Sequence, residues 1–253
     1  MVCPSSPESF LRDWFVLGLV KALDTAKDPR ILVVEDAIGR LGNIVRNRRL
    51  KVHLDYGTFA NALKSLESTF YEVKYSYAEP GQLAELPATR KIVEEISRMG
   101  TTIESAVSSA NYRPKTVGER LALSEFRYGV RTVEGLPRRL ALPDDPAFAV
   151  DIIAVEVTQV SKVEGSDKLT LCRCTDAARI WTIVTNIQRI KPGTRLPAAV
   201  LPPTEMMGVV SEAMFLGGDP LPEDTTLGLL SAPPEAALNQ ARGQVMALIK
   251  RLA

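Results

Sequence analysis

The sequence predicts an α+β multidomain protein, with an N-terminal all-α helical bundle followed by a C-terminal five-stranded β-barrel and a terminal helix. Apolar residues recur at helical spacing up to about residue 128 and at every second position beyond residue 150. Between these regions, three prolines and two aspartates fall within residues 137–146, which is typical of a linker. We therefore expect a helical domain at residues 1–140, and a barrel domain with its terminal helix at residues 147–253.

Four or five helices are expected in the first domain. One follows Ser6-Pro7, a favourable N-cap and first-turn pair, and carries Phe10 and Trp14 on one face. The last begins at Thr116, since Glu119 stands at the spacing of a capping box. Three helices between them are marked by Ile38, Leu41 and Val45, by Phe59, Leu63, Leu66, Phe70 and Val73 before Pro80-Gly81, and by Ile92, Ile96, Met99, Ile103 and Val107.

Short strands with alternating apolar and polar residues are expected beyond the linker, separated by Gly and Pro turns. Five such strands fit a small closed barrel. A final helix is expected over residues 234–252, with Leu238, Val245, Leu248 and Leu252 along one face. The expected strands cover residues 152–159, 169–175, 181–184, 196–200 and 213–216.

Bulk properties narrow the class of protein. The net charge is only +1, so any binding of nucleic acid must depend on a local patch or on shape. Three cysteines favour a reducing, cytoplasmic location. Arg12 and Asp13 interrupt the N-terminal apolar residues, which argues against a secretory signal. The apolar run 14–20 is far shorter than the roughly 20 residues of a membrane helix, so no membrane association is expected.

Three motifs follow one another in the barrel region. After a strand at residues 151–157 come Ser-Asp-Lys-Leu at residues 166–169 and Ile-Val-Thr-Asn-Ile at residues 183–187. Residues 207–214 then read Met-Gly-Val-Val-Ser-Glu-Ala-Met. In this order they resemble the tRNA-binding domain appended to methionyl-tRNA synthetases and to the phenylalanyl-tRNA synthetase β chain, which also forms stand-alone tRNA-binding proteins. The resemblance implies an OB-fold barrel that binds tRNA without a cofactor.

Several residues depart from the pattern of that family. Val163-Glu164 stands where the family has His-Pro, and Ala213 replaces a glycine. Two family lysines correspond to Pro202 and Glu205, so the second position has the opposite charge. Residues 150–218 hold seven Lys or Arg and seven Asp or Glu residues, which gives the barrel no net charge. The barrel fold is therefore predicted more firmly than tight RNA binding by the barrel alone.

Candidate RNA-binding residues in the barrel are of two kinds. Lys and Arg side chains neutralise phosphates, and polar side chains hydrogen-bond sugars, phosphates or exposed bases. From the motifs and their neighbours, the candidates are Lys162, Lys168, Asn186, Arg189, Lys191, Arg195, Ser211, Glu212 and Met214.

The helical half offers further positive charge, because residues 1–140 hold 21 Lys or Arg residues against 17 Asp or Glu residues. Basic residues interleaved with tyrosines suit RNA, although an ordinary solvated helix face has the same composition. One cluster contains the secondary candidates Arg46, Arg48, Arg49 and Lys51. A second cluster contains Arg113, Lys115, Arg120, Arg127, Arg131, Arg138 and Arg139.

The sequence therefore predicts a non-catalytic RNA-binding protein whose partner is tRNA or another structured RNA. The alternative is a protein-interaction or dimerisation module associated with an aminoacyl-tRNA synthetase. In the resembling family the segment after the last motif helps to pair two barrels, so Gly217–Leu230 implies a homodimer. No catalytic set is evident, since His53 has no Ser or Cys partner. Cys172 and Cys174 share one strand face and are expected to be buried rather than to bind a metal.

Overall fold

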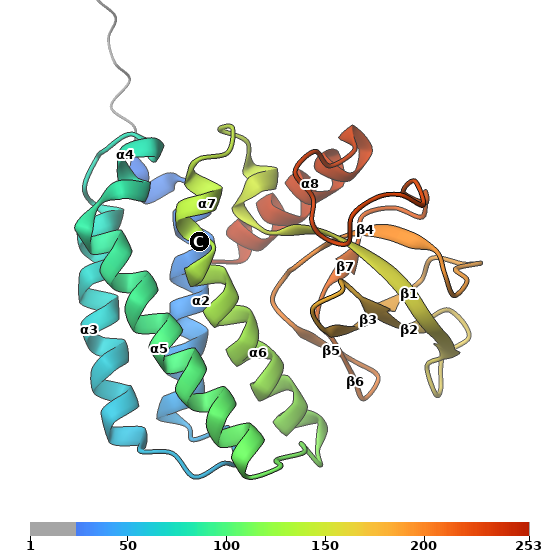
Figure 1. Cartoon of the computed structure of the whole chain (residues 1–253), viewed down its shortest axis with the longest axis horizontal. Coiled ribbons are helices and arrows are strands. Elements are labelled where there is room, and N and C mark those ends of the chain that lie inside the picture. Colours follow the sequence, from blue (N-terminus) through green and yellow to red (C-terminus); the bar gives the residue numbers. More distant parts are fainter. Residues whose placement is uncertain (1–23, 253) are drawn as a thin grey trace, which may run out of the picture.

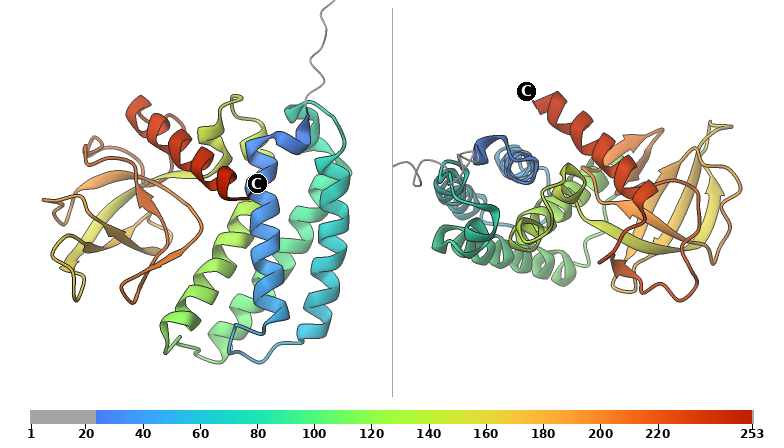
Figure 2. Two further views of the ribbon diagram at one scale, coloured as in Figure 1. Left: turned by 180° about the vertical axis from the view of Figure 1, so that it is seen from behind. Right: turned by 90° about the horizontal axis from the view of Figure 1, so that it is seen from above.

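The computed structural model describes residues 24–252 and shows a helical bundle beside a nearly closed antiparallel barrel (Figure 1). The last helix packs between these two parts (Figure 2). The predicted fold class is thereby confirmed. The helix expected after Ser6-Pro7 lies outside the described residues.

Prolines and N-cap side chains set where the bundle helices begin. The Asp28 carboxylate accepts a hydrogen bond from the Arg30 backbone N–H, and Pro29 occupies the first helical turn. Thr116 caps its helix in the expected way, accepting from the Glu119 N–H at 3.1 Å. The helices are α2 (Pro29–Arg46), α3 (Tyr56–Lys74), α4 (Pro80–Glu85), α5 (Pro87–Ser109), α6 (Val117–Glu134) and α7 (Leu136–Leu140), after a short 3-10 turn η1 (Thr25–Lys27).

Prolines lie in the first turn of short helical segments at two places. The third helix, α3, ends at Lys74, before Pro80 as expected, and Pro80 itself begins α4. The expected linker 137–146 overlaps α7 and a 3-10 turn, η2 (Pro146–Ala149). Proline lacks a backbone N–H and has a fixed φ, so it suits a first helical turn as well as a break. Only residues 141–145 connect α7 to η2.

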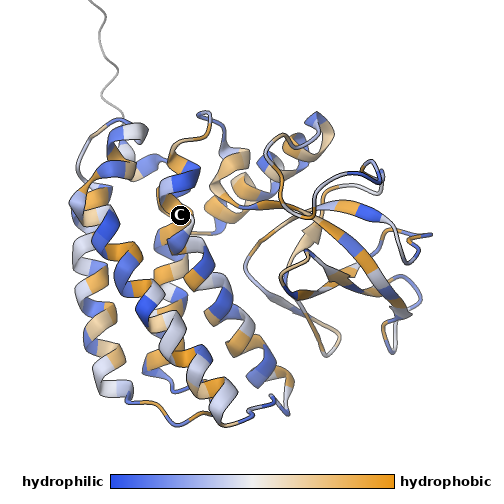
Figure 3. Cartoon of the chain, in the orientation of Figure 1, coloured by the Kyte–Doolittle hydropathy of each residue, from blue (hydrophilic) through white to orange (hydrophobic). Residues whose placement is uncertain are grey.

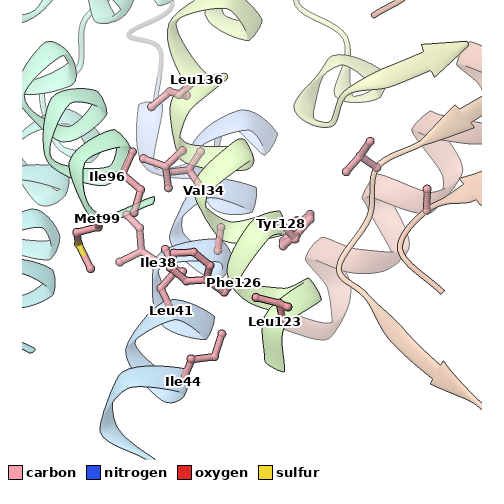
Figure 4. Close-up of a cluster of buried hydrophobic side chains, with 14 of the residues drawn as sticks. Val34, Ile38, Leu41, Ile44, Ile96, Met99, Leu123, Phe126, Tyr128 and Leu136 are labelled. Atoms are coloured by element: carbon pink, nitrogen blue, oxygen red, sulfur yellow. The ribbon is translucent and has the colours of Figure 1, made fainter. Parts of the chain in front are cut away.

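The bundle core lies where α2, α5 and α6 meet. Ile38 and Leu41 of α2 face Phe126 of α6 in a cluster of buried apolar side chains (Figure 4). Gly129 of α6 lies against Leu41, because a Cβ atom on it would be 2.7 Å from the Leu41 Cγ, so a side chain there would force this contact to rearrange. Apolar residues recur along the helices and alternate with polar ones along the strands (Figure 3).

The barrel sheet has the strand order β3-β2-β1-β4-β7, and β8 pairs with β1. All five predicted strands are present. A bulge between Val157 and Gln159 bends β1, so that one strand pairs with β4 at its start and β2 at its end. The strands are β1 (Ile152–Lys162), β2 (Thr170–Thr175), β3 (Ile180–Thr185), β4 (Arg195–Ala199), β7 (Met214–Phe215) and β8 (Gly228–Leu229), and the separate hairpin is β5 (Thr204–Met206) with β6 (Val209–Ser211).

The last helix, α8 (Glu235–Leu252), joins the barrel to the bundle. Its buried residues Ala241 and Val245 belong to an apolar cluster that includes Val33 of α2 and Ala199 of β4. Arg242 adds an ion pair with Asp145, in the segment that precedes η2. The helix therefore completes the packing of α2 as much as that of the barrel.

Asp151, immediately before β1, is the ionic centre of the domain interface. Its carboxylate is only 5 % exposed and accepts hydrogen bonds from Arg131 of α6 and from Arg138 and Arg139 of α7. Burial acts to raise the pKa of Asp151, but the three guanidinium groups outweigh it and hold that pKa below its usual value. Three arginines of the helical domain thus converge on one carboxylate at the start of the barrel.

These contacts change the interpretation of the second basic cluster. Arg131, Arg138 and Arg139 neutralise Asp151, and Arg127 pairs with Glu104 at 2.7 and 2.9 Å. The cluster is therefore neither a free RNA-binding stripe nor an ordinary solvated face. Its exposed members that form no ion pair within residues 24–252 are Arg113, Lys115 and Arg120.

Replacing Asp151 with Asn should destabilise the protein, because it leaves the buried Arg139 guanidinium without an anionic partner. Breaking a buried ion pair in this way costs about 3 kcal/mol or more. Chemical denaturation measures this free energy of unfolding. Asp167→Asn is the control, since Asp167 is exposed, and it should change the value by less than about 0.5 kcal/mol. Equal effects of the two variants would contradict the role given to Asp151.

The stabilisation by Asp151 should also depend on pH. A carboxyl with a lowered folded pKa contributes stability above its unfolded pKa, near 3.8, and loses it as the pH falls through the folded value. The difference in unfolding free energy between the unaltered protein and Asp151→Asn should therefore be constant near neutrality and shrink below about pH 4. A difference that stays constant to pH 2 would contradict this expectation.

Candidate RNA-binding surface

Three of the barrel candidates lie at one end of the sheet. Lys162 pairs with Thr170 between β1 and β2, and Thr170 pairs with Thr185 between β2 and β3. Lys168 precedes this row and Asn186 follows it, and the Lys162, Lys168 and Asn186 residues are all exposed. The sheet register therefore brings together two cations and an amide that are up to 24 positions apart in sequence.

The turn that carries Lys168 has a defined shape. Ser166 Oγ accepts hydrogen bonds from the backbone N–H groups of Lys168, at 3.3 Å, and Leu169, at 3.1 Å. A Cβ atom on Gly165, which has a φ of +76°, would lie 3.3 Å from the Met207 Cε. The turn thus contacts the tip of the β5–β6 hairpin, the hairpin that carries Glu205.

Two further candidates lie in the loop between β3 and β4. Arg189 and Lys191 are both exposed there, and Arg189 has a φ of +67°, in the left-handed region. The loop returns to the sheet where Val157 of β1 donates to the Thr194 carbonyl and accepts from the Gly193 N–H. Lys162, Lys168, Asn186, Arg189 and Lys191 together are called the barrel rim below.

The other four barrel candidates are engaged within the fold. Arg195 donates to Glu156 at 2.9 Å and to backbone carbonyls of the segment before β8. Ser211 is buried, accepts from the Val184 N–H at 2.9 Å and donates to the Ala213 carbonyl at 3.0 Å. Met214 of β7 is half-buried and pairs with Ala199.

Glu212, the fourth of these, links the barrel to the bundle. Its carboxylate accepts from the Thr182 N–H at 3.0 Å, from the Arg179 guanidinium, and from Ser124 Oγ of α6 at 3.3 Å. The last motif therefore supplies contacts that close the barrel and hold the domains together. The sequence of the motif did not predict this structural role, because the hydrogen-bond partners of Glu212 and the N–H donor to Ser211 come from other elements.

In the first helical cluster, Arg46, Arg48 and Lys51 are exposed, at the C-terminal end of α2 and just beyond it. Cations at a helix C-terminus also stabilise the helix dipole. Arg49 differs from them, because its guanidinium pairs with Glu125 of α6 at 2.6 Å. Three of the four secondary candidates are therefore free to meet a ligand.

A cleft of about 820 Å³ separates the bundle from the barrel. Arg120 and Arg127 of α6 line one wall, while Arg173 of β2 and Arg179, just before β3, line the other. The Arg179 guanidinium also lies 4.0 Å from the ring centre of the buried Trp181. Arg173 was not among the RNA-binding candidates predicted from the sequence. It stands two residues from Leu171, so both side chains lie on the same face of β2.

Comparison with known proteins separates the chain into two parts. Residues 22–143 match the family described as an alpha helical domain, and residues 152–241 match the family described as a putative tRNA binding domain. Among solved structures, the chain is similar to the MetRS related protein from Pyrococcus horikoshii, with 26% sequence identity over 34% of this chain and 83% of that chain and a TM-score of 0.26. No curated protein sequence matches the chain.

Cys172 and Cys174 are fully buried in β2, as expected. Burial raises the pKa of the Cys172 thiol to about 11 and that of Cys174 to about 12, so neither forms the thiolate that metals and oxidants require near neutral pH. Residues 24–252 hold no group of three His, Cys, Asp or Glu side chains placed for a metal ion. No helix in the same residues has the length and apolar character of a membrane span.

The two buried thiols should be inert in the folded protein. In a Cys3→Ser variant, a thiol-reactive chromophore at pH 8 should label neither Cys172 nor Cys174, because both are buried and protonated. After unfolding in denaturant, the same reagent should label two thiols per chain. Labelling of the folded variant as fast as of the unfolded one would show that β2 is open to solvent.

Proposed function

We propose, from a barrel that belongs to the tRNA-binding domain family, that this protein binds tRNA and catalyses no reaction on it. The match to that family over residues 152–241 carries the proposal. The four cations of the barrel rim neutralise RNA phosphates, and Asn186 hydrogen-bonds sugars or exposed bases. Cytoplasmic location is part of the same proposal.

The helical domain supports this binding in our proposal. Arg46, Arg48 and Lys51 supply a secondary group of phosphate contacts, since each side chain is exposed. Such contacts position an RNA without reading its sequence. The barrel has no net charge, so it gains from cations elsewhere in the chain. In this proposal the barrel rim and the helical domain both neutralise phosphates of the same RNA.

An interaction module paired with a second copy or with a synthetase is the second candidate. Leu229 of β8 favours it, since this apolar side chain is 47 % exposed within the segment Gly217–Leu230. The helix after this segment is less suited to pairing two barrels, because α8 buries its apolar face against α2 and η2. A strictly monomeric mass in solution would count against the homodimer, and failure to recover a synthetase by pull-down would count against that association.

Titration of the unaltered protein with total tRNA at low salt tests the main proposal. Saturable binding is expected, with an affinity that falls as the salt concentration rises, because phosphate neutralisation releases counterions. Non-specific affinities extend to a Kd of about 100 µM. Absence of binding up to that concentration would overturn the proposal.

Restoring a family cation at Glu205 should strengthen tRNA binding. Glu205→Lys replaces an exposed carboxylate on β5 with an ammonium group, and one added phosphate contact steepens the log–log salt dependence by about 0.9. Glu67→Lys is the matched control, because it makes the same charge change at an exposed position on α3, across the bundle from the barrel (Figure 1). Equal gains for both variants would mean that only net charge matters.

A further inference from the structure

The interdomain cleft is formed by two walls of different origin. Residues of α5 and α6 form one wall, and residues of β2, β3 and β6 form the other. Hydrogen bonding from Ser124 of α6 to Glu212 connects the walls. The cleft therefore forms only when the helical domain and the barrel pack together.

The arginines of the cleft are of two kinds. Arg127 and Arg179 are held by the carboxylates of Glu104 and Glu212, which fixes their positions on opposite walls. Arg120 and Arg173 are exposed, and neither forms an ion pair within residues 24–252. Four guanidinium groups against two carboxylates leave the cleft with an excess of two positive charges.

The lining between the arginines is mixed, with apolar side chains beside the polar Ser124 and Thr182. Leu171 and Ile180 project from the barrel wall and Leu123 from the bundle wall, and Ile180 is 51 % exposed. Unpaired bases stack on guanidinium planes and pack against apolar side chains, while their phosphates attract cations. A cleft of about 820 Å³ is of the size that holds a compact organic ligand, so it admits a few unpaired nucleotides and excludes a duplex.

We infer that the interdomain cleft binds unpaired nucleotides of the RNA, with Arg120 and Arg173 contacting phosphates from opposite walls. This inference rests on the proposed tRNA binding and assigns it a second site, distinct from the barrel rim. The two arginines without an ion pair come from different walls, Arg120 from α6 and Arg173 from β2. That arrangement suits a strand that crosses the cleft better than a single small anion.

Binding of RNA to paired variants tests the inference. Arg120→Gln with Arg173→Gln removes both free cations of the cleft, and Lys64→Gln with Lys91→Gln removes two exposed cations from α3 and α5 as a control. The cleft variant should bind total tRNA at least about tenfold more weakly, since a hydrogen bond to a charged group contributes that much. Its log–log salt dependence should flatten by about 1.4, the value for two single-strand phosphate contacts.

Trp181 provides a second, local measurement. Trp14 is the other tryptophan of the chain, so Trp14→Phe leaves emission from Trp181 alone, beneath Arg179. A single-stranded RNA hexamer should change this emission, and a blunt-ended RNA duplex should not. Combining Trp14→Phe with the cleft variant should abolish the change. Arg120→Lys with Arg173→Lys, which keeps both charges, should weaken tRNA binding less than the Arg→Gln pair does, because a lysine still neutralises a phosphate.

The outcomes separate the inference from the proposed function. Equal tRNA affinity in the cleft and control variants, or emission that responds to the duplex as it does to the hexamer, overturns the inference. If Lys168→Gln with Arg189→Gln then still weakens tRNA binding, the proposed function stands with the barrel rim as its site. Absence of tRNA binding by the unaltered protein overturns the proposed function, and the inference with it.

Discussion

The buried carboxylate of Asp151 is the interaction on which the arrangement of the whole molecule depends. Asp151 immediately precedes the first barrel strand, and its three arginine partners come from α6 and α7 of the bundle. One of these, Arg131, also lies 5.5 Å from the ring centre of Trp181 in the barrel. A charge at this position has little water around it, so it is tolerated only while the domains stay in place. The cleft between the walls follows from that constraint.

Apolar periodicity in the sequence predicted the longer helices and strands, because each of these elements shows its own regular spacing of apolar residues. Helical spacing located α2, α3, α5 and α6, and alternation located five of the six strands of the main sheet. Proline gave an ambiguous signal, since Pro80 begins α4 and Pro137 lies in the first turn of α7, although proline also breaks helices. The β5–β6 hairpin escaped notice because three-residue strands are too short to show a period.

The candidate site was predicted only in part, for a related reason. Exposure of Lys162 and Lys168 follows from their place at the ends of strands, and the pattern of the barrel predicts that. The engagement of Arg195 by Glu156 and of Glu212 by Ser124 depends on tertiary neighbours. The same holds for the arginines of the second cluster, whose carboxylate partner stands beyond the expected linker. Composition shows a surplus of cations but does not show which of them are already neutralised.

The position of α8 has a consequence for how the chain is made. This helix leaves the ribosome after the barrel, yet its buried face covers Val33 on α2, near the start of the described residues. During synthesis this part of α2 therefore stays without its α8 contacts until the barrel and α8 have emerged. Domains of larger chains often fold as units in the order of their synthesis. Here α2 acquires its full packing only after the barrel, so nascent chains leave Val33 uncovered by α8 until that helix has emerged.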